Sequence, residues 1–549
     1  MKKTLFFCFL LVSLINLVSC DPENVIDQPA VDSDTLDYVW DTTKVVKISL
    51  NETSIACTSK DVTISGTTAT IKAKGSYEIS GTLNDGQIVV DADGLVRLIL
   101  KNANILNSTT SPLFVNQADK AIIILPEGTT NTISDGPNYT VTADSLNAAI
   151  FSKDYLAVFG KGKLIVNGNY NSGISSKDEL IIQSGTLEVT AVGTGIKGKD
   201  YLKIYDGNIT VNSGGDALKS DNDSLVSSLG YVDIENGTFS LVSANDGISA
   251  SNLVRISAGT FNIVTGGGSA ITPGLESTKG IKAKSIAVSG GTFTINSSDN
   301  SIDADNDIVI NNGTFTLYSA DKPLDCDSTI IINNGDVNIA KAEKGISGHH
   351  ITFNGGKVTV VSKNDCIKAT LGTDQTTDDG SSVNVTGGTV LLSTDKGDAL
   401  DSNGSITVSS GLLAIQGSQT SPDDAISYRS TCLISGGTVV AAGATSLAPS
   451  ATSTQNSVSI RFSSILAPGT VVNIQDASGV SLLTYKVTKY AYSIVISVPA
   501  LAIATTYNVY TGGTTTGTSL NGYYSDGVYT PGTKRGSFTV SGKVTSVTM

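Results

Sequence analysis

Pairs of acidic side chains recur at fixed positions after an apolar residue, here called the anchor. Two consecutive copies of this pattern carry only aspartate one and three residues after the anchor: Asp303, Asp305, Asp325 and Asp327. In an extended strand these two positions point to the same face. If consecutive copies form neighbouring strands of one sheet, their carboxylates lie roughly 4.8 Å apart. At that distance two charges repel by about 3.5 kcal/mol at an effective dielectric of 20. A cation would relieve this repulsion, and an oxygen-only ligand set favours Ca²⁺ over zinc. The alternative is a solvated acidic face.

A second acidic set lies two residues before the anchor. Its members are Asp216, Asp246, Asp365, Asp398 and Asp424. Asp221 and Asp223 follow closely after Asp216, so this group adds candidate metal ligands: Asp216, Asp246, Asp221 and Asp223. Aspartate at such a position also caps turns by accepting hydrogen bonds from the backbone. Metal binding and capping both remain open for this set.

Lysines recur at the third position after the anchor in three early copies: Lys153, Lys177 and Lys199. A lysine ladder can bind the repeated carboxylates of a uronic-acid polymer, or it can pair with the aspartate that follows each lysine. Lys197 and Lys219, beside Asp216 and Asp221, are further candidates for contact with an acidic sugar. In a polysaccharide lyase, such a lysine would take the C5 proton while Ca²⁺ neutralised the uronate.

Other catalytic signals are weak. His349 and His350 are the two histidines, and they are adjacent in a predicted turn, whereas an acid–base pair needs side chains that converge. No P-loop, serine elbow or HExxH motif occurs. The formal net charge of −14 argues against a nucleic-acid partner.

The elements that must position these residues form a repeat. Many anchors are 21 to 24 residues apart, a small residue precedes most of them, and a Gly-Thr step and a β-branched strand follow: Ile150, Ile174, Ile196, Leu218, Ile248, Ile271, Ile281, Ile302, Leu324, Ile346, Ile367, Leu400 and Ile426. Ile271 and Ile281 are too close for both to be anchors, so one lies in an insertion. Leucine-rich-repeat spacing is absent. The pattern predicts an all-β protein with a right-handed parallel β-helix over residues 56–445.

Both ends of the chain differ from the repeat. Residues 1–19 have the charge and apolar run of a lipoprotein signal peptide, and Cys20 is the predicted lipidation site. Residues 20–55 then form a tether, so we expect an exported protein anchored by lipid at the bacterial outer membrane or cell surface; the alternative is an ordinary signal peptide. Residues 446–549 contain alternating strands that predict a small antiparallel β domain.

Three segments resemble a known bacterial family. They are Gly81–Ile88 (GTLNDGQI), Ala148–Asp154 (AAIFSKD) and Gly214–Asp223 (GGDALKSDND). The chain resembles the carbohydrate-binding domain-containing proteins, a family first described in a clostridial cell-surface protein, over roughly residues 45–510. This resemblance implies a β-helix related to pectate lyases, bound calcium, and affinity for cellulose or acidic sugars.

Three functions follow as hypotheses. The first is non-catalytic, calcium-dependent binding of polysaccharide, either acidic sugars such as polygalacturonate or cellulose, at the bacterial cell surface. The second is a calcium-dependent, pectate-type lyase. The third is a structural adhesin or spacer with no ligand on its lateral surface.

Overall fold

The computed structural model describes residues 35–140, 146–372 without 225 and 227, and 377–549. The predicted signal peptide, Cys20 and the first part of the tether lie outside these residues. Two short 3₁₀ turns, η1 (Thr35–Tyr38) and η2 (Thr42–Lys44), are the helical elements of the described chain. No helix in the described ranges has the length and apolar character needed to cross a membrane.

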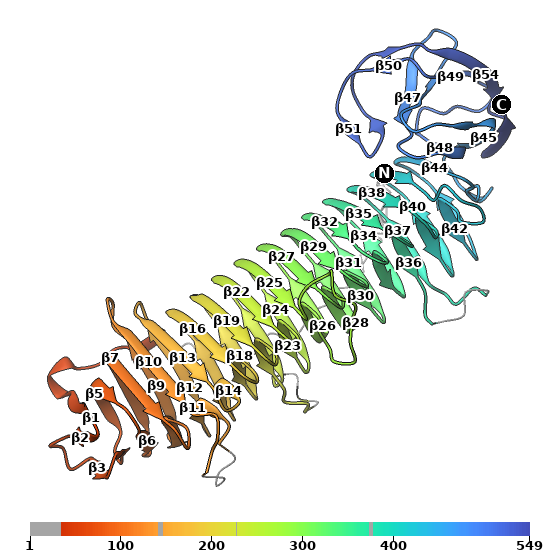
Figure 1. Ribbon diagram of the computed structural model, residues 1–549. Coiled ribbons are helices and arrows are strands. Elements are labelled where there is room, and N and C mark those ends of the chain that lie inside the picture. Colours follow the sequence, from red (N-terminus) through yellow and green to blue (C-terminus); the bar gives the residue numbers. More distant parts are fainter. Residues whose placement is uncertain (1–34, 141–145, 225, 227, 373–376) are drawn as a thin grey trace, which may run out of the picture.

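The chain winds into a long solenoid that runs from β1 (Val46–Glu52) to β44 (Thr438–Gly443) (Figure 1). Most coils contribute one strand to each of three parallel sheets, named here sheets 1, 2 and 3. The predicted parallel β-helix is therefore confirmed. The solenoid begins earlier than expected, because β1 lies within residues 20–55, the segment predicted as tether, and already pairs in parallel with β5 (Gly75–Leu83).

Sheet 1 carries the anchors. Its strands are β4 (Thr68–Ile71), β6 (Gln87–Asp91), β8 (Leu113–Gln117), β11 (Ala148–Ser152), β14 (Ser172–Ser176), β17 (Ile196–Gly198), β20 (Leu218–Ser220), β23 (Ile248–Ala250), the first parts of β26 (Ile281–Val288) and β28 (Ile302–Ile310), β30 (Leu324–Cys326), β33 (Ile346–Gly348), β36 (Ile367–Ala369), β39 (Leu400–Ser402) and β42 (Ile426–Tyr428).

Sheet 2 follows in each coil. It contains the first parts of β1, β5 and β7 (Leu95–Asn107), the second parts of β26 and β28, and β9 (Lys120–Leu125), β12 (Leu156–Gly160), β15 (Glu179–Ile182), β18 (Tyr201–Ile204), β21 (Tyr231–Ile234), β24 (Leu253–Ile256), β31 (Thr329–Ile332), β34 (His350–Phe353), β37 (Ser382–Val385), β40 (Ser405–Val408) and β43 (Cys432–Ile434).

Sheet 3 completes the coil. It contains the second parts of β1, β5 and β7, then β10 (Thr130–Asp135), β13 (Lys163–Gly168), β16 (Thr186–Ala191), β19 (Asn208–Ser213), β22 (Thr238–Ser243), β25 (Thr260–Thr265), β27 (Thr292–Ser297), β29 (Thr314–Ser319), β32 (Asp336–Lys341), β35 (Lys357–Ser362), β38 (Thr389–Thr394), β41 (Leu412–Gln416) and β44.

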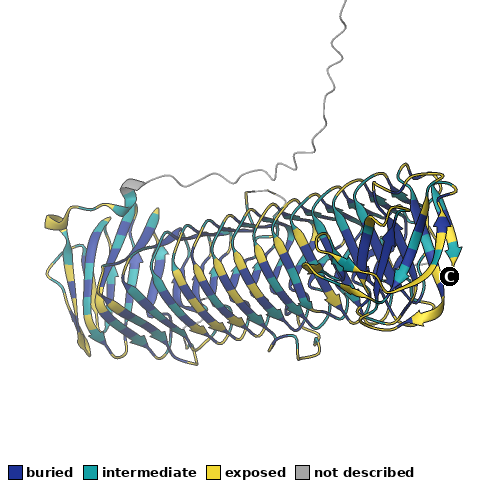
Figure 2. Cartoon of the chain, turned by 90° about the horizontal axis from the view of Figure 1, so that it is seen from above, coloured by how far each residue is buried: buried dark blue, intermediate teal, exposed yellow. Residues whose placement is uncertain are grey.

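The interior is a set of apolar ladders, visible as dark stripes along the solenoid in Figure 2. The anchors stack in register from coil to coil and are almost fully buried. Ile281 is the anchor of its coil, whereas Ile271 is 51% exposed in the insertion between β25 and β26. Four phenylalanines of sheet 3 also stack, with ring centroids 4.6 to 4.7 Å apart: Phe239, Phe261, Phe293 and Phe315.

The Gly-Thr step has a steric cause. Gly313 has φ +129°, and a Cβ there would lie 2.9 Å from Cε2 of Phe315. A side chain is therefore disfavoured both by the backbone conformation and by the aromatic ladder. The glycine lets the chain turn tightly before the strand that carries the phenylalanine.

Antiparallel strands close both ends. At the N-terminal end, β2 (Ser54–Ala56) pairs with β1, and β3 (Val62–Ser65) pairs with β4. At the other end, β48 (Ala491–Ser497) pairs with β44 on one side and with β45 (Ser457–Leu466) on the other.

The remaining C-terminal strands confirm the predicted antiparallel domain. Six of them form one sheet, in the order β51-β52-β47-β46-β49-β54. Their bounds, with those of the other C-terminal strands, are β46 (Val471–Gln475), β47 (Ser481–Lys486), β49 (Thr506–Thr511), β50 (Thr514–Thr515), β51 (Ser519–Leu520), β52 (Tyr523–Tyr524), β53 (Tyr529–Thr530), β54 (Thr533–Thr539) and β55 (Val544–Thr548).

Candidate functional site

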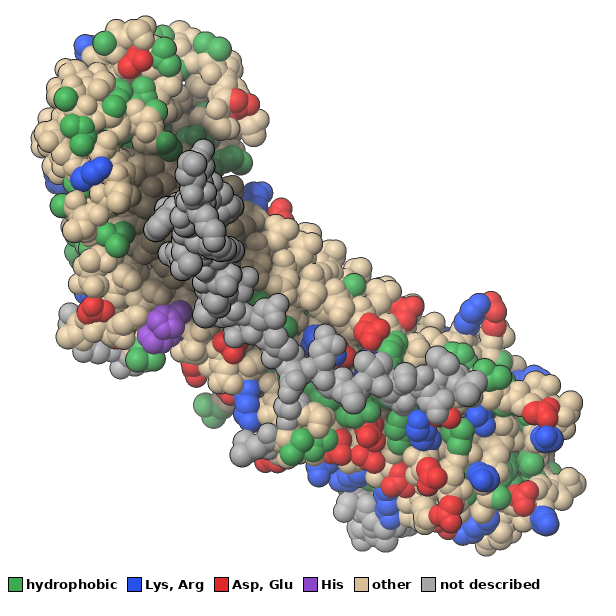
Figure 3. Space-filling view, turned by 180° about the vertical axis from the view of Figure 1, so that it is seen from behind, with side chains coloured by type: hydrophobic (Ala, Val, Ile, Leu, Met, Phe, Trp, Pro, Cys, Tyr) green, Lys and Arg blue, Asp and Glu red, His purple; other side chains and the backbone are tan. Residues whose placement is uncertain are grey.

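Outward side chains next to the anchors form three columns along the solenoid. Column 1 is the residue after the anchor, column 2 lies two residues before it, and column 3 lies three residues after it. From β17 to β39, column 1 reads Lys197, Lys219, Ser249, Lys282, Asp303, Asp325, Ser347, Lys368 and Asp401. Charged side chains of both signs gather along the solenoid in Figure 3.

The predicted acidic stack exists, and lysines lie against it. Asp303 and Asp325 are register partners on β28 and β30. Lys279 in column 2 is 3.3 Å from Oδ2 of Asp303 and also pairs with Asp299, while Lys322 pairs with Asp325. The side-chain amide of Asn300 donates to Oδ2 of Asp303 at 2.6 Å and to Oδ2 of Asp325 at 3.1 Å.

These partners meet the electrostatic need that the sequence argument assigned to a metal. Burial raises the pKa of the Asp303 carboxyl, and the Lys279 charge opposes that shift. Two ammonium groups and one amide thus face two carboxylates, and the repulsion between the rungs is offset by side chains of the protein itself.

The column 2 aspartates cap the neighbouring coil. Oδ1 of Asp216 accepts a hydrogen bond from the backbone N–H of Asp246 at 3.1 Å, and Oδ1 of Asp246 accepts from the N–H of Lys279 at 2.8 Å. Oδ2 of Asp216 pairs with Lys219 at 2.7 Å. Capping, one of the two alternatives for these positions, accounts for their contacts.

The other predicted metal ligands do not join these carboxylates. Asp305, Asp327 and Asp223 are exposed, and Asp221 pairs with Lys197. Among the described residues, no group of three or more His, Cys, Asp or Glu side chains is arranged to hold a metal ion. The predicted quartet is therefore not a fitting calcium site in this arrangement. Ca²⁺ as a cofactor stays a prediction.

The lysine ladder lies where it was expected, and two of its lysines lie near the rings of phenylalanines one coil before them. Lys153 donates to Oδ1 of Asn116 at 2.7 Å and lies 5.5 Å from the Phe114 ring centroid. Lys177 is exposed and lies 5.9 Å from the Phe151 ring centroid, and Lys199 is exposed one coil further.

The aspartates beside this ladder form a separate acidic column. Burial, followed by the neighbouring carboxyls of Glu179 and Asp200, raises the pKa of Asp178 to about 7. Asn222 donates to Oδ1 of Asp200 at 2.6 Å. This column therefore has its own internal partners.

A groove crosses sheet 1 over β20, β23 and β26. Columns 1 and 3 supply its floor in three successive coils: Lys219 with Asp221, Ser249 with Ser251, and Lys282 with Lys284. The two serines are short, so a depression of about 260 Å³ opens between the longer side chains on either side, and Asp305 closes its far edge.

Lys282 and Lys284 are the cations of this groove that sequence reasoning missed. Lys282 donates to Oγ of Ser277 at 3.3 Å, and Lys284 donates to Oδ1 of Asn252 at 3.0 Å. In the described part of the chain, neither ammonium group has a carboxylate within ion-pair distance. Their positions, one and three residues after the anchor Ile281, could have predicted outward-facing side chains on sheet 1. The sequence did not decide whether Ile271 or Ile281 is the anchor, so these lysines were not recognised.

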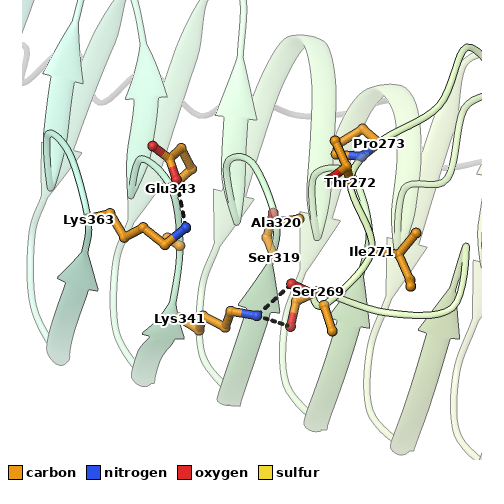
Figure 4. A pocket seen from close by; sticks show the side chains of 11 residues that line it. Ser269, Ile271, Thr272, Pro273, Ser319, Ala320, Lys341, Glu343 and Lys363 are labelled. Carbon is orange, nitrogen blue, oxygen red and sulfur yellow. Dashed lines mark hydrogen bonds and ion pairs between the residues drawn. The ribbon is translucent and has the colours of Figure 1, made fainter.

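A larger cleft lies where the chain passes from sheet 3 to sheet 1. The insertion after β25 folds over the turns that follow β29, β32 and β35, and encloses about 400 Å³. Lys341 fastens the insertion by donating to the carbonyl oxygen of Ser269 at 2.5 Å, and Lys363 pairs with Glu343 at 3.0 Å, as Figure 4 shows.

A parallel β-helix with a polar groove across one sheet defines a class of elongated proteins that present repeated side chains laterally. The family model of the carbohydrate-binding domain-containing proteins matches residues 65–325 and 321–471. These matches cover well over half of the chain, and the protein belongs to this family.

Two known proteins are similar to parts of the chain. A carbohydrate-binding domain-containing protein of Acetivibrio thermocellus is 36% identical over 126 residues, which are 22% of this chain and 44% of that relative. The chain thus matches less than half of that relative's length. A solved structure of a polysaccharide lyase-like protein from C. thermocellum is 29% identical, with a TM-score of 0.37, over 46% of this chain and 93% of the other.

Proposed function

We propose that this protein binds acidic polysaccharide without cleaving it, and that the groove over β20, β23 and β26 is the binding site. The observation that carries the proposal is the pair Lys282 and Lys284, whose ammonium groups have no carboxylate partner in the described chain. Membership of a carbohydrate-binding family supports the general class of ligand.

The groove matches a uronate in charge and in hydrogen bonding. Its lysines donate to a carboxylate, while the hydroxyls of Ser249 and Ser251 can donate to or accept from sugar hydroxyls. Column 1 places Lys219 two coils from Lys282, roughly 9.6 Å away. A carboxylate that enters the depression between them can replace part of the water on the ammonium groups of Lys282 and Lys284.

The contacts of the other lysines favour binding over lyase chemistry. Burial lowers the pKa of Lys219, but its hydrogen bond to Asp216 and the charges of Asp216, Asp221 and Asp246 outweigh that effect and raise it overall. A lysine that is held protonated is a poor base for the C5 proton. Lys197 also has a carboxylate partner, Asp221.

The test is binding to polygalacturonate by the double variant Lys282→Ala, Lys284→Ala. Each lost ammonium contact at a partly exposed site is worth about 0.5–1 kcal/mol, so the two together weaken binding by roughly 5- to 30-fold. The control is Lys60→Ala, Lys534→Ala, which makes the same charge change at two exposed lysines outside the groove. Equal affinity of the groove variant and the control would refute the proposed site.

The same preparation decides between binding and cleavage. Incubation with polygalacturonate, with and without EDTA, should leave chain length unchanged and give no unsaturated product. Formation of such product that Lys219→Ala abolishes would establish the lyase alternative. Loss of binding in EDTA by the otherwise intact protein would assign calcium a direct part in binding.

The lipid anchor belongs to the same proposal. Lipidation at Cys20 and the tether would hold the solenoid at the outer membrane or cell surface, where a polysaccharide can reach its lateral face. The full chain should partition with membranes, and Cys20→Ser should release it. Membrane association that is unchanged in Cys20→Ser would overturn the anchor.

A further inference from the structure

The groove over β20, β23 and β26 contains a carboxylate without a partner as well as its two unpaired ammonium groups. Asp305 lines the far edge of the depression and is exposed. Among the residues that the structure describes, its carboxylate has no ion-pair or hydrogen-bond partner, although Lys284 lies on the neighbouring strand. The groove therefore presents free charges of both signs on adjacent coils, which are roughly 4.8 Å apart along the axis.

A β-bulge separates these opposite charges. The register of the β26–β28 pair shifts by one residue, so that Lys284 alone stands opposite both Asp305 and Asn306. An extra residue of this kind bends its strand and redirects the side chains around it. Lys284 donates instead to Oδ1 of Asn252, which belongs to the coil on the other side. Both charges thus remain available to a ligand.

A polyuronate with a carboxylate on every sugar does not match this charge pattern. In a chain that runs along the solenoid axis, a unit seated on Lys282 and Lys284 places the next unit near Asp305, because a pyranose unit is about as long as one coil. A second carboxylate there is repelled by Asp305. An ammonium group at the same place gains a charge-assisted hydrogen bond.

We propose that the groove recognises a polysaccharide segment in which a uronate is joined to an amino sugar with a free amine. The uronate carboxylate binds Lys282 and Lys284, and the protonated amine binds Asp305. The inference rests on the proposed function, because it names the chemistry of the ligand for the same groove. The site then selects a balance of charges along the polysaccharide rather than negative charge alone.

The experiment compares three oligosaccharides by calorimetry with the full chain. They are an alternating glucuronate–N-acetylglucosamine oligosaccharide, the same compound after chemical removal of its acetyl groups, and an oligogalacturonate of equal length. One exposed ion pair changes affinity by roughly 2- to 5-fold, so the wild type should bind the deacetylated compound more tightly than the acetylated one by at least this factor. Asp305→Asn should lose this preference and should bind oligogalacturonate roughly 2- to 5-fold more tightly than the wild type does.

Asp327→Asn is the matched control, because Asp327 is the exposed residue of column 3 one coil beyond Asp305. The protein has a formal net charge of −14, so a less negative ligand or a less negative protein surface can change affinity without a specific contact. Such an effect is common to both variants. A preference for the free amine that Asp305→Asn removes and Asp327→Asn keeps is therefore evidence of a contact with Asp305.

The same preference for the deacetylated compound in the wild type and both variants would overturn the inference, and so would an equal loss of it in Asp305→Asn and Asp327→Asn. Neither result concerns the uronate contact itself, whose test is weaker oligogalacturonate binding in Lys282→Ala, Lys284→Ala. If that double variant binds all three compounds like the wild type, the proposed function fails together with this inference.

Discussion

Lys279 and Lys322 lie against the stacked carboxylates of Asp303 and Asp325, and their part in neutralising this pair can be tested with the double substitution Lys279→Met, Lys322→Met. The variant removes both ammonium groups and keeps the Asn300 bridge. Two carboxylates one rung apart then repel by about 3.5 kcal/mol at an effective dielectric of 20. This sets the upper end of the expected loss of stability at neutral pH.

The pKa of Asp303 determines how the variant's loss of stability should change with pH. Burial already raises the pKa of Asp303, and loss of Lys279 removes a charge that lowers it. A carboxyl with a raised pKa in the folded state costs stability once it ionises, so the deficit should grow as pH rises above the ordinary value near 3.8 and be absent below it. Relative to its control, the variant should therefore lose more stability between pH 4 and pH 7 than the wild type does.

The assay is thermal unfolding from pH 3.5 to 8, with hydrogen exchange of β28 and β30 to locate the effect. Lys47→Met, Lys396→Met is the control, because both lysines are exposed. EDTA should leave the wild-type transition in place. The reasoning is refuted if EDTA lowers the wild-type melting temperature while the lysine double variant unfolds like its control.

Three further predictions concern stability. Burial, followed by the charges of Asp401 and Asp365, raises the pKa of Asp398 to about 6, so the wild type should lose at most about 3 kcal/mol of stability between about pH 4 and 6. Asp398→Asn should remove this loss, because the asparagine still accepts the hydrogen bond from the N–H of Asp424. A wild-type melting temperature that does not fall over this pH range would contradict the prediction. Lys368 and Asp401 form a buried ion pair, 6% and 4% exposed; Lys368→Met should cost about 3–5 kcal/mol in denaturant unfolding, and Lys368→Met with Asp401→Leu should recover most of it. Phe293→Ala interrupts the phenylalanine ladder and should cost about 3–5 kcal/mol, with faster hydrogen exchange in β25 and β29 than Phe293→Leu; equal exchange in the two variants would show that the stacking contributes little.

The sequence predicted the ladders well because their cause is local and repeated. The small residue, the anchor and the Gly-Thr step each follow from sterics within one coil, so the spacing of Ile302 and Leu324 was enough to place Asp303 beside Asp325. Capping by Asp216 was likewise one of the two functions that its position in the repeat predicted.

The partners across columns could not be predicted in the same way. Lys279 reaches Asp303 because a residue two positions before one anchor lies beside the residue that follows the next anchor. Lys279 also stands at the end of the insertion between β25 and β26, and the sequence does not show the path of that insertion. The same insertion hid Lys282 and Lys284 and produced the cleft, since its course over β29, β32 and β35 depends on contacts such as that of Lys341 with Ser269. Long-range placement of an irregular segment leaves no periodic trace.

The antiparallel pairing of β48 with β44 has a consequence for how molecules meet one another. Every coil presents the same backbone edge as the coil before it, so a bare terminal coil would accept the first coil of a second molecule and allow end-to-end growth into filaments. At one end β48 reverses the strand direction, and at the other the hairpins made by β2 and β3 occupy the first coils. The length of the solenoid is therefore fixed by the number of coils in one chain. Its lateral faces remain as the surfaces on which it can make contacts.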